Sequence, residues 1–415
     1  MRKNLLLTLF ATLLFSNLIG QEKKFEVDIH GFVGFDAMYD SRVVKSVRHN
    51  HILLYALPEK LDANGNDLKD RSSFEMGALI SRFNIQVKGP TVNGISTFAM
   101  IEGDLSAGTS GGDGEFLTRH AYMQLGYEKF SLIAGQTWHP FFIPENFPQT
   151  LNAGVGVPIH PLSRNPQIRL TYKPTDKIEM SASVIEQGAF RSTGFFKGTE
   201  EAATPEIALQ LKAGGTGAIW GSITGGYKTL AVPSYVEKTA QPTKFGSYHL
   251  SASLRFKTKY LIARAGSIYG GNLTEHAMIG GVGKKTSSTV DKPKYQAQYT
   301  HSLWMDLSTT VKNFETGFFI GNISNLGADT DIIVNEELGR DSNIGNILMI
   351  TPRVRYLIGT HVWVGIEHIY NVAGYGLQLD ANTNKYVSSF DSKGKPTNLK
   401  NYTANRTQLS FRFTF

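Results

Sequence analysis

The chain of 415 residues contains no cysteine, which excludes disulfide frameworks, thiolate metal sites and lipid attachment through a cysteine. After residue 20 it also lacks any apolar run close to the roughly 18 residues that a membrane helix requires. Charged residues make up only 19% of the chain, and the mean hydropathy is −0.18. Such an average suits a soluble protein, but it equally suits a membrane β-barrel, whose strands alternate apolar and polar residues.

The first residues have the features of a secretory signal peptide. A basic start at Arg2 and Lys3 precedes an apolar run from Leu5 to Phe15, and small or polar residues follow up to Gly20. We therefore expect residues 1–20 to be removed and residues 21–415 to form one exported domain. The net charge of +7 is modest, and without a basic patch interleaved with aromatics it predicts no nucleic-acid partner.

Glycine and aromatic residues are abundant, with 42 Gly, 25 Phe and 17 Tyr, and segments of period two run through the chain. Phe25, Val27 and Ile29 occupy one phase of the first such segment, which predicts a half-apolar strand. Long polar segments, beginning with residues 39–75, alternate with short turns from there to the end. This asymmetry predicts an all-β fold: a transmembrane antiparallel β-barrel of about 16 strands, with long external loops, short periplasmic turns and a water-filled lumen.

The last segment shows the alternation most clearly. Phe411, Phe413 and the terminal Phe415 share one phase, whereas Arg406 and Arg412 lie on the other. Arginines on one face of a strand require that this face meets water, so the aromatic face is expected to contact membrane lipid. The terminal aromatic resembles the assembly signal of outer-membrane barrels. Phe411, Phe413 and Phe415 are therefore predicted to be read by the barrel assembly machinery.

An irregular insert interrupts the strand pattern at residues 139–165. It is rich in proline, shows no alternation, and carries the polar residues His139, Glu145, His160 and Arg164. A segment this long and irregular inside a regular β pattern is either functional or disordered, and its aromatic and proline content argues against disorder. We expect it to fold into the lumen and to set the width and charge of a pore.

The block before this insert carries a family resemblance. TRHAYMQLGYEKFSLIAGQTWHPFF resembles the general trimeric porins and, among them, the DcaP-like (dicarboxylate) porin family with its RHAY and GQTW elements. The resemblance implies a 16-stranded homotrimer of the bacterial outer membrane whose third external loop folds inward. It also implies that Arg119 faces the constriction, although its phase-mates Ala121 and Met123 are apolar and strict alternation would place it outside.

Cationic and acidic side chains on the polar phases are candidate pore residues. A ring of cations in a narrow pore would raise the local concentration of anions, and carboxylates of the wall and insert would supply a field of opposite sign. This predicts passive diffusion of small hydrophilic, anionic solutes, with Arg82, Arg119 and Arg169 clustered opposite Glu145. The full candidate set is Arg82, Glu102, Asp104, Arg119, His139, Glu145, His160, Arg164, Arg169, Arg353, Arg355, Arg406 and Arg412.

Two alternative functions stay open at this point: an outer-membrane hydrolase of phospholipase or protease type, and a ligand-binding or adhesin barrel. No Gly-flanked serine with a neighbouring histidine stands out as a nucleophile. The string LDANGND departs from a calcium loop at Asp67 and Ser73, which predicts a plain turn. His49 and His51 lack a third metal ligand nearby. We accordingly expect no enzyme activity, no metal and no cofactor.

Overall fold

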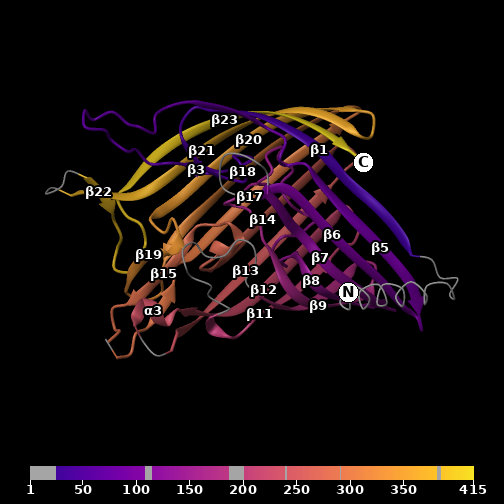
Figure 1. Ribbon diagram of the computed structural model, residues 1–415, viewed down its shortest axis with the longest axis horizontal. Helices are drawn as coiled ribbons and strands as arrows, with labels where there is room; N and C mark the ends of the chain where they lie inside the picture. The colour runs from indigo at the N-terminus through magenta and orange to yellow at the C-terminus, as the bar shows by residue number, and fades with distance from the viewer. Residues whose placement is uncertain (1–24, 108–114, 187–200, 239–240, 290, 381–384) are drawn as a thin grey trace, which may run out of the picture.

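In a computed structural model, the structure describes residues 25–107, 115–186, 201–238, 241–289, 291–380 and 385–415. They form a closed antiparallel β-barrel of 16 wall strands (Figure 1). Each wall strand pairs with the next along the chain, and β1 closes the barrel by pairing with β23. The predicted all-β barrel is therefore confirmed. The predicted signal peptide, residues 1–20, lies outside the described residues.

The wall strands occupy most of the chain. The first half of the wall consists of β1 (Glu26–Asp40), β5 (Arg82–Val92), β6 (Ile95–Ala107), β7 (Glu115–Tyr127), β8 (Phe130–Trp138), β9 (Arg164–Thr175), β10 (Ile178–Ile185) and β11 (Glu206–Ala213). The second half consists of β12 (Ile219–Val232), β13 (Thr243–Lys257), β14 (Leu261–Gly271), β17 (Tyr299–Val311), β18 (Phe314–Gly327), β20 (Ile344–Ile358), β21 (Val362–Asp380) and β23 (Leu399–Thr414).

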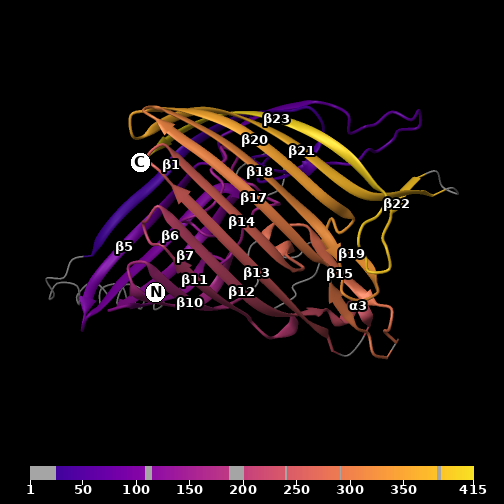
Figure 2. The ribbon, with the colours of Figure 1, turned by 180° about the vertical axis from the view of Figure 1, so that it is seen from behind.

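Short elements lie in the long connections at one end of the barrel. They are β2 (Val44–Val47), β3 (Ile52–Ala56), β4 (Ser73–Gly77), α3 (Ser234–Glu237), the 3-10 helix η1 (Thr274–His276), β15 (Gly280–Lys285), β16 (Tyr295–Ala297), β19 (Ile332–Arg340) and β22 (Lys385–Ser388). β15, β19, β22 and α3 gather at the end of the barrel away from the C-terminus (Figure 2). Among the described residues, no helix has the length and hydropathy to cross a bilayer.

The other end of the barrel carries the short turns. Between β5 and β6, Asn93 and Gly94 both adopt positive φ, at 51° and 80°. This is the conformation of the Asn-Gly turns that suit the right-handed twist of paired strands. The predicted arrangement of long connections at one end and short turns at the other is therefore present.

Alternation divides each wall strand between an outer apolar face and an inner polar face. On β1, Val27 and Ile29 are 59% and 61% exposed, whereas Asp36 and Asp40 point inward and are buried. On β23, Phe411 and Phe413 are exposed while Arg406 is buried. An apolar outer surface around a polar interior is the arrangement that a bilayer requires of a barrel.

The buried core lies inside the barrel. It combines inward side chains of the wall with two inward-folded segments, residues 139–163 between β8 and β9 (the third loop) and residues 41–72 between β1 and β4 (the first loop). The prediction for the first loop was wrong in part, because residues 39–75 were expected to be an external polar segment. Its strand β3 is buried along its whole length, and the apolar run ILLYA explains this.

Candidate functional site

The third loop crosses the lumen and is anchored on the opposite wall. Glu367 of β21 accepts hydrogen bonds from the backbone N–H groups of Leu151 and Asn152, at 2.6 and 2.9 Å. Asn146 donates to the carbonyl oxygens of Leu254 on β13 and Ala265 on β14, at 3.2 and 3.1 Å. These anchors satisfy polar groups of an irregular segment that has left bulk water. Residues 139–165 were expected to fold into the lumen, and residues 139–163 do so, whereas Arg164 and Asn165 already belong to β9.

Two wall glycines make room for the loop. A Cβ at Gly321 of β18 would lie 2.8 Å from a side-chain carbon of Ile159, and one at Gly365 of β21 would lie 2.7 Å from Leu151. Real Cβ atoms do not approach other carbons that closely. The side chains of Ile159 and Leu151 can therefore pack directly against the backbone of the wall because the wall has no side chain at these two positions.

The first loop enters from the other side and narrows the same space. The backbone N–H of Ala56 donates to Asn371 Oδ1 at 2.9 Å, and the hydroxyl of Tyr375 donates to the Ala56 carbonyl at 3.0 Å. At its base, Arg406 of β23 donates to both carboxylate oxygens of Asp40, each at 2.7 Å, and to the carbonyl of Asn50. The first loop is thus held by side chains of β21 and β23.

A cavity of about 290 Å³ remains between the two loops and residues of the wall strands β1, β5 to β9 and β23. Five arginines contribute to the lining of this cavity. Its arginines come from one loop and four wall strands: Arg48, Arg82, Arg119, Arg164 and Arg412. The remaining lining is mainly apolar and includes Ile52, Trp138, Phe142, Phe147 and Leu151. The constriction therefore presents positive charge and apolar surface to the same small volume.

Wall carboxylates compensate part of this positive charge. Arg119 donates to Glu102 at 2.7 Å and to Asp104 at 3.1 Å, and Arg82 lies 3.7 and 3.6 Å from the same two carboxylates. Asp36 of β1 pairs with Arg412 at 2.8 Å. Three carboxylates thus face a larger number of arginines, so the arginine cluster keeps a net positive charge. At Arg48, on the first loop, burial lowers the guanidinium pKa and the nearby Asp104 opposes this effect.

Arg164 has no compensating carboxylate within ion-pair distance among the described residues. It is 1% exposed, and its Nε and Nη1 atoms have no hydrogen-bond partner there. Its guanidinium lies instead over the ring of Trp138, which stacks on Phe142 with ring centroids 3.8 Å apart. The aromatic pair comes from the end of β8 and the start of the third loop. A buried cation with unused donors is a ready binding partner for an anion.

A β-bulge explains why Arg119 faces the lumen. The pairing of β6 with β7 shifts between Glu102 and Gly103, which oppose His120 and Thr118 and leave Arg119 without a partner on β6. Arg119 and His120 are consequently both buried on the inner side, at 8% and 6% exposure. Strict alternation would have placed Arg119 outside, and the facing implied by the family resemblance is the one observed.

Four of the predicted arginines lie on the inner wall outside the cavity lining. Arg169 donates to the carbonyl of Trp138 at 2.6 Å, and Arg353 pairs with Asp306 at 2.8 Å. Arg355 pairs with Glu315 at 2.6 Å, and Arg406 holds the first loop as described above. Arg82, Arg119 and Arg169 were expected to form one cluster, and this prediction is wrong for Arg169. The Arg169 side chain instead binds the backbone at the end of β8.

The acidic and histidine residues of the third loop also lie away from the arginine cluster. Glu145 was expected opposite the arginines, but its carboxylate pairs with Lys212 of β11 at 2.9 Å. His139 is buried against Glu206, and His160 packs edge-on against Phe142 and Trp304. Burial lowers the pKa of His160 to about 3, so this imidazole is neutral. None of these three side chains lines the cavity.

Sequence reasoning missed Arg48, Trp138 and Phe142 as cavity residues. Arg48 lies in a segment without regular alternation, and its place near Arg164 depends on the fold of the first loop. Trp138 and Phe142 are part of the GQTWHPFF string on which the family resemblance rests. Their aromatic spacing at the junction of β8 and the third loop was the available signal.

Comparison with known proteins gives similarity in structure alone. No protein-family model matches the sequence, and no curated protein matches it. The solved structure of the outer membrane channel DcaP of Acinetobacter baumannii superimposes with a TM-score of 0.69 at 15% identity, over 94% of this chain and 97% of that one. The anion-selective porin from Comamonas acidovorans gives 0.54 at 12% identity, over 94% and 100%.

A third similar structure is the OmpF of Salmonella typhi in complex with daunomycin, with a TM-score of 0.52 at 10% identity, over 94% of this chain and 97% of that one. At these identities the likeness concerns the fold. The resemblance recognised in the RHAY and GQTW elements is confirmed at that level. This chain has the fold of the porin-like outer-membrane channels, a 16-strand barrel similar to that of DcaP.

Proposed function

We propose that this protein is an outer-membrane channel for passive diffusion of small anionic solutes, with carboxylates as the preferred class. The observation that carries the proposal is the arginine cluster of the constriction, in which Arg164 has unused hydrogen-bond donors. A guanidinium presents a planar fork of N–H donors that matches a carboxylate. Arg119 and Arg412 already form ion pairs with carboxylates of the wall. The carboxylate of a passing solute would therefore replace a wall carboxylate as the partner of an arginine, and the wall carboxylate would return when the solute leaves.

Electrostatics favour anions over cations in this space. Charges are screened over roughly 8 Å at physiological salt, and a sphere of about 290 Å³ measures roughly 8 Å across, so the centre of the cavity lies well within the screening distance of its lining. Every ion that passes would feel the arginine cluster, and the surrounding apolar side chains lower the local dielectric. The wall carboxylates reduce the barrier to release because they compete with the solute for the same arginines.

The outer face supports the proposed location and assembly. Large apolar side chains are exposed on both the first and the last wall strands, as Val33 and Phe413 illustrate. We propose export by the signal peptide, insertion by the barrel assembly machinery, membrane lipid around the outer face, and association as a homotrimer. Among similar solved structures, the OmpT of Vibrio cholerae is described in a trimer form.

A hydrolase is the alternative that the structure allows us to weigh. On the outer face, Ser267 Oγ lies 3.0 Å from His301 Nε2, which is hydrogen-bonding distance. Among the described residues, no carboxylate contacts His301. A serine nucleophile needs a base that is itself oriented by a third group. The pair therefore lacks a member of such a triad, and the channel is the better-supported function.

The experiment is reversal-potential measurement on the purified protein in planar bilayers under a potassium chloride gradient. We expect the zero-current potential to have the sign of an anion-preferring pore and addition of succinate to reduce the chloride current. Succinamide, which has the same carbon skeleton without charge, serves as the control solute and should leave the current unchanged. A cation-preferring channel, or equal effects of the two solutes, would overturn the proposal.

A further inference from the structure

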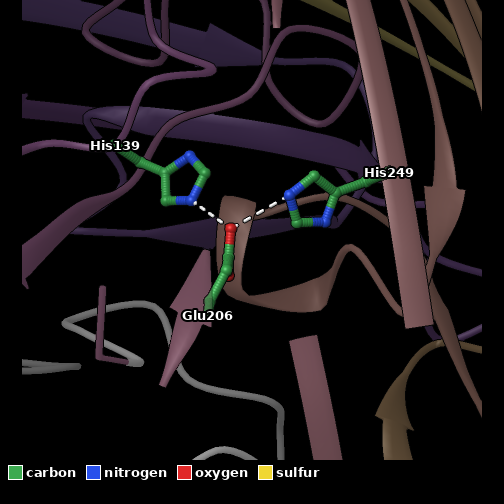
Figure 3. Close-up of side chains that lie close together, drawn as sticks. All are labelled: His139, Glu206 and His249. Carbon is green, nitrogen blue, oxygen red and sulfur yellow. Dashed lines mark hydrogen bonds and ion pairs between the residues drawn. The ribbon is translucent and has the colours of Figure 1, made fainter. Parts of the chain in front are cut away.

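A cluster of histidine and glutamate side chains lies beside the third loop, apart from the arginine cluster. His139 is the first residue after β8, Glu206 opens β11 and His249 lies on β13 (Figure 3). One oxygen of Glu206 lies 2.8 Å from His139 Nε2 and 2.9 Å from His249 Nε2. The candidate ligand atoms of the three residues all lie within 4.8 Å of one another. Elements distant in sequence thus bring together two imidazoles and a carboxylate.

A third imidazole, that of His276 in η1, completes the surroundings. Its ring centroid lies 4.4 Å from that of His139 and 6.3 Å from that of His249. His276 is fully buried; its Nε2 lies 3.4 Å from a carboxylate oxygen of Glu275, and its Nδ1 has no hydrogen-bond partner among the described residues. The Nδ1 atom of His249 likewise has no hydrogen-bond partner there, whereas its Nε2 lies 2.9 Å from Glu206. Buried ring nitrogens without a hydrogen-bond partner keep a lone pair or an N–H group that can serve a bound ion.

The buried charge of Glu206 also supports an ion-binding site. Glu206 is 4% exposed, and within the described part of the chain its ion-pair partners are the two imidazoles, with no lysine or arginine. The nearby Lys228 does not serve this purpose because it pairs with Glu275. A buried carboxylate whose partners are imidazoles alone lacks a permanently charged partner, and burying a charge in this way is costly unless it is paired or coordinates a metal.

We propose that His139, Glu206 and His249 bind a divalent transition-metal ion of the zinc class, with His276 beside them as the fourth donor. Imidazole nitrogens and a single carboxylate are the donor set that such ions prefer, whereas calcium and magnesium take oxygen ligands. His139 Nδ1 now accepts a 3.2 Å hydrogen bond from the N–H of Phe141. Binding through Nε2 would break that long bond, a small cost beside the metal–ligand bonds formed.

The site would fix the root of the third loop. It joins the residue that follows Trp138 to β11, β13 and the connection after β14, and Trp138 lines the constriction cavity. Metal binding would therefore hold the neighbouring Trp138 in place in the lining of the cavity. This role does not depend on which solute the channel passes, so the site can be tested without reference to anion selectivity.

The test uses the full-length protein, purified from membranes without a histidine tag, stripped with EDTA and titrated with Zn²⁺ or Co²⁺. We expect about one equivalent per chain by elemental analysis and, with Co²⁺, the intense visible absorption of a four-coordinate site. Glu206→Gln and His249→Ala should each abolish both signals. His301→Ala and His368→Ala, which alter exposed histidines outside the cluster, should keep them.

Gel mobility before and after heating reports whether each variant forms a barrel. If a cluster variant does not fold, the wild-type Co²⁺ spectrum decides alone. A folded wild type that binds no stoichiometric metal would overturn the proposal, as would the weak absorption of a six-coordinate ion. Binding that persists in folded Glu206→Gln and His249→Ala would equally overturn it. Failure of this test would leave the reversal-potential result unaffected, so the two proposals can fail separately.

Discussion

The guanidinium carbon of Arg164 lies 4.7 Å from the centroid of the Trp138 ring, whose other neighbour, Phe142, stacks on it. Arg164 opens β9 directly after the third loop, and Trp138 closes β8 directly before it. The residues that flank the third loop thus form a cation–π contact in the lining of the constriction cavity. This contact orients a cation that has no carboxylate partner within ion-pair distance.

Replacing Arg164 should weaken anion preference. Arg164→Gln removes a charge that is not neutralised by a neighbour, and we expect the anion-to-cation permeability ratio to fall by roughly fivefold, equivalent to about 1 kcal/mol. Arg355→Gln is the matched control, because Arg355 also lies on the inner wall but pairs with Glu315 outside the cavity. Reversal potentials of the two variants measure the difference. Equal shifts in both variants would contradict a special role for Arg164.

Removing the anchor of the third loop should widen the pore. Glu367→Ala deletes the acceptor of the Leu151 and Asn152 N–H groups, each hydrogen bond contributing on the order of 1 kcal/mol. We expect higher single-channel conductance and larger current noise, with assembly preserved. Deleting residues 147–157 should raise the conductance further. Conductance that stays at the wild-type value in both variants would show that the third loop does not limit flow.

Acidification should loosen the third loop through His160. Its pKa is lowered to about 3 by burial, below the value near 6.5 of an exposed histidine. The packed, neutral form therefore contributes full stability above about pH 6.5, and this stability is lost as the pH falls toward 3, by on the order of 1 kcal/mol per pH unit. Current noise recorded from pH 7.5 to 4.5 should rise.

The control for this prediction is His160→Phe, which keeps an aromatic ring against Phe142 and Trp304 but cannot be protonated. The rise in noise on acidification should be smaller in this variant than in the wild type. An identical pH response in the two proteins would assign the effect to other groups.

The outer face of β23 should be required for assembly. Phe413 is 50% exposed on the apolar side of the strand, and Phe413→Asp would place a charge toward lipid at a cost of up to roughly 2 kcal/mol. We expect Phe413→Asp, or removal of Phe415, to abolish the heat-modifiable band of the folded barrel in outer-membrane fractions. Phe413→Leu keeps an apolar side chain and should assemble. Normal assembly of the Asp variant would argue against lipid contact at this position.

Local patterns in the sequence were sufficient to predict the barrel. A period of two specifies which face of a strand is apolar, and the long and short connections specify which strands are neighbours. The Asn93–Gly94 turn and the alternation of Phe411 and Phe413 with Arg412 are local features of this kind. Such features depend on a few adjacent residues and on the presence of a bilayer. They can therefore be predicted from the sequence without knowledge of contacts between distant residues.

The candidate sites were decided by tertiary structure. Arg119 faces the lumen because of a bulge against Glu102, and Arg48 reaches the cavity because the first loop folds inward. His139 and His249 meet at Glu206 although more than a hundred positions separate the two histidines in the chain. Period and spacing carry no information about such contacts, since they arise only when barrel closure brings loops and opposite walls into one confined volume.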